Sequence, residues 1–104
     1  MANYLLVYHG GGSMPASEAE QAQVMQAWTD WFGKLGPALV DGGNPASQTK
    51  TIASDGSVGP AGSNPPSGYS VIKANDIDSA VALAKGCPIL GSGSIEVVET
   101  IEAM

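Results

Sequence analysis

Histidine exchanges protons most readily near neutral pH, and this sequence has one, His9, between the apolar run Tyr4–Tyr8 and three glycines. Asp41 similarly ends a second apolar run and precedes Gly42 and Gly43. If the two strands are neighbours, the carboxylate would orient the imidazole, as general acid–base chemistry requires. We therefore predict His9 and Asp41 as a catalytic pair. The alternatives are a structural histidine and a turn-forming aspartate.

Four further residues are candidates for binding a small molecule: Trp28, Asn44, Tyr69 and Ser70. An indole such as that of Trp28 can wall a flat ligand, although helical tryptophans more often pack in a core or a dimer contact. Tyr69 and Ser70 begin a β-prone run beside a loop, where ordinary sheet packing is the alternative. Asn44 precedes a proline, so turn formation is its alternative.

Several familiar motifs are incomplete. His9–Gly12 resembles the oxyanion element of esterases, but no G-x-S-x-G nucleophile motif accompanies it. Pro15 stands where a dinucleotide fingerprint needs its last glycine, and a Gly-Lys-Ser/Thr phosphate loop is missing. Cys87 follows a predicted helix end, where the dipole disfavours the thiolate. One histidine and one cysteine cannot form a zinc cage. We expect neither a metal nor a cofactor.

Composition narrows the class of protein. The 104 residues include four lysines, no arginine and ten acidic residues, for a net charge of −6. Nucleic-acid binding needs a basic surface, so that class is excluded. One cysteine allows no internal disulfide. A signal peptide and a membrane-spanning run are not apparent, so a soluble cytoplasmic domain spanning residues 1–104 is expected.

The first half of the chain alternates strand and helix signals. Tyr4–Tyr8 is typical of a buried strand. Ser17 followed by Glu20 forms a capping box that predicts a helix start, and Gly36-Pro37 predicts its end. The helix carries an apolar stripe of Val24, Met25, Trp28, Trp31, Phe32 and Leu35.

The second half of the chain repeats the order strand, helix, strand after a middle stretch of short strands and a loop. Residues 38–41 and 48–54 predict short strands, and Asp55-Gly56 predicts a turn toward Val58. The stretch 59–68, GPAGSNPPSG, predicts a flexible surface loop. A strand over 69–74, a helix capped by Asn75 and ended by Lys85-Gly86, and a strand over 94–101 complete the chain.

This order predicts an α+β, ferredoxin-like βαββαβ fold, with an antiparallel sheet and two helices on one face. The uncovered face of such a sheet needs shelter, so we expect a symmetric homodimer.

The chain resembles the YCII-related family, close to the DGPF/YCII group, along essentially its whole length. The resemblance rests on Asn3–Tyr8, the helix bearing Trp28 and Trp31, Leu39–Gly43, Gly68–Ala74 with Asp76–Ala80, and Gly93–Val97. It implies a dimeric α+β barrel with a small-molecule pocket. The family's helical histidine has no counterpart here, and Asn64–Ser67 replaces the Asp-Gly-Pro-Phe turn of the subgroup.

Two functions follow as hypotheses. The first is a cofactor-free enzyme that acts on a small organic molecule in a pocket of the homodimer, using His9 with Asp41. The second is a non-catalytic module that binds a small molecule or a partner protein, in which binding survives the loss of His9.

Overall fold

The computed structural model describes residues 2–10 and 17–101 of the chain. Within that part, neither helix is long and apolar enough to cross a membrane. Two short 3-10 turns, η1 (Gly36–Ala38) and η2 (Pro88–Gly91), accompany the main elements. These elements are β1 (Ala2–Gly10), α1 (Glu18–Leu35), β2 (Leu39–Asp41), β3 (Lys50–Ile52), β4 (Val58–Pro60), β5 (Pro66–Ala74), α2 (Ile77–Ala84) and β6 (Gly93–Glu99).

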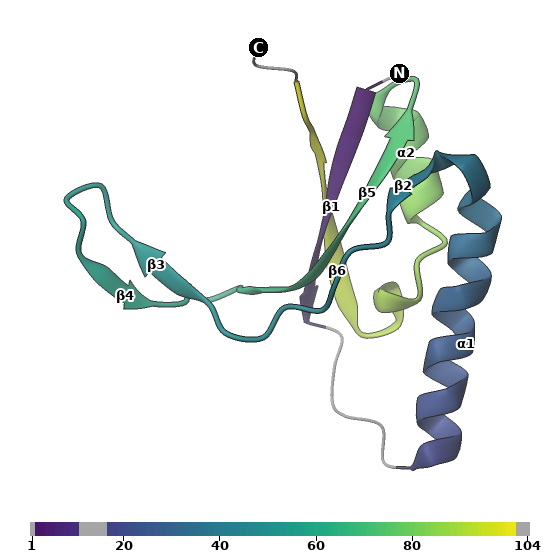
Figure 1. The fold of residues 1–104 in the computed structure, drawn as a ribbon, viewed down its shortest axis with the longest axis horizontal. Helices are drawn as coiled ribbons and strands as arrows, with labels where there is room; N and C mark the ends of the chain where they lie inside the picture. Colours follow the sequence, from purple (N-terminus) through teal and green to yellow (C-terminus); the bar gives the residue numbers. More distant parts are fainter. Residues whose placement is uncertain (1, 11–16, 102–104) are drawn as a thin grey trace.

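Four strands form an antiparallel sheet in the order β2-β5-β1-β6. Both helices lie on the same side of this sheet (Figure 1). The expected α+β class is confirmed, and the arrangement is compatible with a ferredoxin-like fold. The chain order departs from βαββαβ because β3 and β4 are inserted between β2 and β5 as a separate two-stranded sheet.

The core lies between the sheet and the helices because successive strand residues point to opposite faces. Every second residue of β1 is buried there, beginning at Tyr4, and β5 contributes Ile72. The larger helix contributes Trp31 and Leu35, whereas α2 contributes small residues that allow close approach. The buried cluster comprises Tyr4, Leu6, Tyr8, Trp31, Leu35, Ile72, Ala74, Ala80, Ala84 and Cys87.

Local capping signals place the helix ends. Ser17 caps α1, since its hydroxyl accepts from the Glu20 amide at 3.2 Å, which confirms the predicted start. The second cap was predicted one residue too early: Asp76, not Asn75, accepts from the Ser79 amide at 2.7 Å. A carboxylate on the amides of a first turn is a strong cap, and this contact lowers the pKa of Asp76.

The apolar stripe of α1 is buried along half of its length. Trp31 and Leu35 are buried, and Trp28 and Phe32 are half-buried, but Val24 and Met25 are exposed. The first turns of α1 extend past the ends of the strands that the helix packs against (Figure 1). The periodicity therefore predicts the correct face of the helix, but the sheet is too short to cover all of it.

The inserted strands β3 and β4 form a projecting hairpin arm, residues 50–60 (Figure 1). Gly56 has a φ of 89°, and the Asp55 carboxylate accepts from the Ser57 amide, so the predicted Asp55-Gly56 turn is confirmed. The arm gives a radius of gyration of 15.2 Å, against about 13 Å for a compact chain of this length. Strands β4 and β5 enter both ends of the stretch predicted as a loop, which leaves residues 61–65 between them.

The sheet surface opposite the helices is the open face. Leu5 of β1 pairs with Val71 on one side and Val98 on the other, so these three apolar side chains lie together there. The first two are half-buried, and Val98 is exposed.

Candidate functional site

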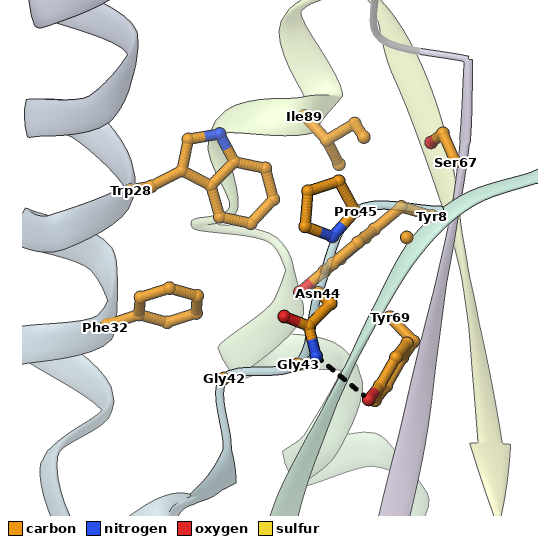
Figure 2. A pocket seen from close by; sticks show the side chains of 11 residues that line it. Tyr8, Trp28, Phe32, Gly42, Gly43, Asn44, Pro45, Ser67, Tyr69 and Ile89 are labelled. Atoms are coloured by element: carbon orange, nitrogen blue, oxygen red, sulfur yellow. Dashed lines mark hydrogen bonds between the residues drawn. The ribbon is translucent and has the colours of Figure 1, made fainter. Parts of the chain in front are cut away.

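A pocket of about 330 Å³ lies between α1 and the β2 edge of the sheet (Figure 2). This volume is at the lower end of the range for small-molecule sites. Its walls come from five parts of the chain: β1, α1, the segment after β2, the start of β5 and η2. The lining residues are Tyr8, Trp28, Phe32, Gly42, Gly43, Asn44, Pro45, Ser67, Gly68, Tyr69 and Ile89.

Three aromatic rings form the apolar side of the pocket. Trp28 meets Tyr8 edge to face, with ring centroids 5.2 Å apart and planes at 74°. Phe32, one helical turn further along α1, lies 5.8 Å from Trp28. Behind them, the Trp31 indole N–H donates to the Leu83 carbonyl at 3.2 Å. This bond joins α1 to α2 and so helps to fix the position of the helix that carries Trp28 and Phe32.

The opposite wall is the segment after β2. Pro45 forms an isolated bridge with Gly68, and the Ala46 amide donates to the Ser67 carbonyl at 2.9 Å. Gly43 permits this close approach: its φ is 74°, and a Cβ there would lie 1.7 Å from the Tyr69 carbonyl oxygen. A side chain at this position is therefore excluded both by space and by backbone conformation.

A buried hydrogen-bond chain fixes the same wall to the sheet. The Tyr8 hydroxyl donates to Ser70 Oγ at 2.7 Å, and Ser70 Oγ donates to the Gly42 carbonyl at 2.7 Å. Burial raises the pKa of Tyr8, so its phenol stays protonated and able to donate. The chain connects the floor of the pocket, at Tyr8, to the wall at Gly42.

Polar groups in the pocket are few and uncharged. The Asn44 side-chain amide donates to the Tyr69 hydroxyl at 3.4 Å (Figure 2). Ser67 also lines the pocket, but its hydroxyl is fully buried, has no hydrogen-bond partner among the described residues and does not face the open space. The lining formed by the described residues carries no charged side chain. Such a surface is suited to a neutral, largely apolar molecule.

Three of the four residues predicted to bind a ligand, Trp28, Asn44 and Tyr69, meet in this pocket. The fourth, Ser70, has no exposed surface and holds the wall from behind. Sequence reasoning missed Tyr8 and Ser67 as lining residues. Tyr8 lies on the same strand face as the core residues Tyr4 and Leu6, and Ser67 falls within the predicted loop, so neither carried a local signal of a binding site.

The predicted pair of His9 and Asp41 is not brought together. The expectation that their strands are neighbours is wrong, because β5 lies between β2 and β1. Asp41 is exposed, and its carboxylate accepts from the Gly43 amide at 2.8 Å, as a turn former does.

His9 is 6% exposed and does not line the pocket. Its Nδ1 lies 3.2 Å from the Pro65 carbonyl oxygen, and its Nε2 lies 2.5 Å from Glu96 Oε1. Both ring nitrogens therefore face oxygen atoms of the chain. In this arrangement neither nitrogen presents a free lone pair to a substrate, which a general base requires.

Cys87 is buried beside the core. Burial raises the pKa of its thiol, so the expected low reactivity is supported, with desolvation as the principal cause.

Comparison with models of known protein families and with curated proteins returned no match. The case for a function therefore rests on the geometry of the chain itself.

Proposed function

We propose that this protein binds a small, neutral, largely apolar molecule in the pocket between α1 and the β2 edge. The observation that carries the proposal is a pocket of about 330 Å³ lined by four aromatic residues and free of charged side chains among the described residues. Sites of this kind bind ligands through apolar contact and use a few polar groups for orientation. Of the two functions expected from the sequence, this geometry favours binding without catalysis.

Titration with N-phenyl-1-naphthylamine, a neutral probe that fluoresces in apolar surroundings, tests the proposal. We expect saturable binding of one probe per chain, with loss of tryptophan emission. Trp28→Ala removes one wall and should weaken binding at least about tenfold, as loss of a buried aromatic contact does. Val24→Ala, one turn earlier on α1 and exposed, is the matched control. Equal affinities in the two variants would place the probe elsewhere.

Catalysis at His9 is the second candidate, and one observation favours it. A buried imidazole in contact with a carboxylate, here Glu96, is an arrangement used in acid–base catalysis. His9→Ala distinguishes the two functions, because His9 does not line the pocket. We expect probe affinity to stay within about twofold of the wild-type value. A loss of binding in a folded His9→Ala protein would contradict binding that is independent of His9, whereas the catalytic hypothesis expects this variant to lose turnover.

We also propose that the protein is a homodimer and that it is related to the YCII proteins, with the barrel that this family implies. The open face supports the dimer, because no element of the described residues forms a layer over Leu5, Val71 and Val98. A second chain is the partner that a symmetric interface supplies.

The hairpin arm supports the same assembly. Ile52 pairs with Val58, and these side chains are 71% and 62% exposed. They share one face of the arm with Lys50 and Pro60, whereas Thr51 and Gly59 occupy the other. A lone two-stranded hairpin is marginally stable in water, and alternating apolar residues indicate that one face is meant to be covered. A second copy of the chain would provide that cover.

A further inference from the structure

The side chain of Asn44 presents an accessible polar group to the pocket. Asn44 is exposed, whereas the hydroxyl of Ser67 is buried and that of Tyr8 is engaged by Ser70. The Asn44 amide nitrogen donates to the Tyr69 hydroxyl, but the amide oxygen has no hydrogen-bond partner in the part of the chain that the structure describes. This oxygen is therefore available to a ligand as an acceptor.

Tyr69 holds Asn44 at two points and so fixes the direction of its amide group. The Tyr69 backbone amide donates to the Asn44 carbonyl at 3.3 Å, and the Asn44 side-chain nitrogen lies 3.4 Å from the Tyr69 hydroxyl. In Figure 2 the amide nitrogen is turned toward Tyr69, and the amide oxygen lies on the side of Trp28 and Phe32. The free acceptor is thus directed toward the space between this wall and α1.

The backbone groups beside Asn44 are already engaged. The Gly42 carbonyl accepts from Ser70 Oγ at 2.7 Å, and the Gly43 amide donates to the Asp41 carboxylate at 2.8 Å. Pro45, the next residue, has no amide hydrogen. A ligand that approaches this wall therefore meets the amide oxygen of Asn44 as the group that can still form a hydrogen bond.

The other side of the pocket limits what can use this acceptor. Tyr8, Trp28, Phe32 and Ile89 provide ring faces and hydrocarbon, which favour a small, flat, apolar body. The indole nitrogen of Trp28 is at the end of the ring farther from Asn44 (Figure 2). A cation could also donate to the amide oxygen, but it would lose its hydration without gaining a counter-ion in the described lining.

We propose that the ligand is a neutral, flat ring compound with one N–H or O–H group, which donates a hydrogen bond to Asn44 Oδ1. This inference rests on the proposed function of the pocket and specifies its ligand class. An amide oxygen accepts but cannot donate, so it does not bond to a ring compound that carries only an acceptor. Asn44 sets which ring compounds are preferred, whereas the aromatic residues provide the affinity that these compounds share.

Equilibrium dialysis with indole and benzofuran tests the proposal, because these flat probes have nearly the same shape and differ in an N–H group against a ring oxygen. We expect the wild type to prefer indole. Asn44→Leu keeps the branched shape of the side chain without its polar atoms, and should reduce that preference roughly three- to tenfold, the effect of one neutral hydrogen bond. Benzofuran affinity should stay within about twofold of the wild-type value.

Two more variants make the test specific. Tyr69→Phe keeps the ring but removes the hydroxyl that orients the Asn44 amide, so the preference for indole should fall while benzofuran affinity is retained. This variant also tests the proposal if Asn44→Leu does not fold. Asn64→Leu, at an exposed asparagine outside the pocket lining, is the matched control and should keep the wild-type preference.

The outcomes separate the ligand class from the proposed function. If the wild type binds N-phenyl-1-naphthylamine but does not prefer indole, or if folded Asn44→Leu keeps the wild-type preference, the role of Asn44 is wrong while the pocket stands. If the wild type binds none of the three probes, the proposed function fails, and the ligand class fails with it.

Discussion

The Tyr8 hydroxyl lies 2.7 Å from Ser70 Oγ, and this contact joins the floor of the pocket to its far wall through the Gly42 carbonyl. Ser70→Ala should leave both the Tyr8 hydroxyl and the Gly42 carbonyl without this partner, and so lower the free energy of unfolding by about 1–3 kcal/mol. Urea denaturation measures the change. Tyr8→Phe is the matched control: it keeps the bond from Ser70 to Gly42 and should cost less. The reverse order of the two variants would show that the chain does not fix the wall.

Alanine substitutions at two neighbouring glycines should have different effects, one on stability and the other on ligand binding. An alanine at Gly43 would collide with the Tyr69 carbonyl, so Gly43→Ala should destabilise the protein by at least about 2 kcal/mol. A Cβ at Gly42 would lie 3.8 Å from the Phe32 ring, an ordinary contact, and so Gly42→Ala should fold normally. Because that methyl group faces another lining residue, it should reduce pocket volume and weaken the binding of N-phenyl-1-naphthylamine. Thermal unfolding and probe titration measure the two effects. Equal stability of the two variants would contradict the described wall.

The hairpin arm should control assembly without controlling the fold of the chain. Ile52→Asp places a charge on the apolar face of the arm, whereas Thr51→Asp places the same charge on the opposite face. Sedimentation equilibrium should show a dimer for the wild type and Thr51→Asp, and a shift toward monomer for Ile52→Asp. Circular dichroism should be the same for all three. A wild type that remains a monomer at micromolar concentration would contradict the proposed dimer.

Stability should decline at alkaline pH. Burial raises the pKa of Cys87 above 9.0 and that of Tyr8 above 10.0, so both groups lose protons more readily in the unfolded chain. Their contribution is complete below the unfolded pKa and decreases as pH rises toward the folded pKa. Urea midpoints should therefore fall above about pH 9. Cys87→Ala removes the thiol and should show a shallower decline. Parallel pH profiles for the two proteins would exclude Cys87 as a source.

The elements that could be predicted from the sequence are those fixed by nearby residues. Ser17 caps a helix through an amide three residues away, and Asp55-Gly56 forms its turn within four residues. Such signals are local, so they survive in any fold. The exposure of Met25 shows the limit of periodicity, because the length of the sheet, and not the helix pattern, decides where burial stops.

The candidate site could not be predicted in full from the sequence, because it depends on contacts between residues far apart in the chain. The contact of His9 with Glu96 joins positions 87 apart in sequence, and strand order determined it. Trp28, Asn44 and Tyr69 were predicted separately, for their residue types, and the fold brings them together. Ser67 was hidden in a proline-rich stretch whose composition predicts a loop. Whether such a hydroxyl is buried, and whether it has a hydrogen-bond partner, depends on the positions of all its neighbours in the fold.

Chemical-shift mapping with isotope-labelled protein and N-phenyl-1-naphthylamine locates the proposed ligand site on the chain. We expect saturable shifts at the amides of Gly42, Gly43, Gly68 and Tyr69, which line the pocket, and unchanged amides at the turn of the hairpin arm. Shifts confined to the strands around His9 and Glu96, or no shifts at saturating probe, would contradict it.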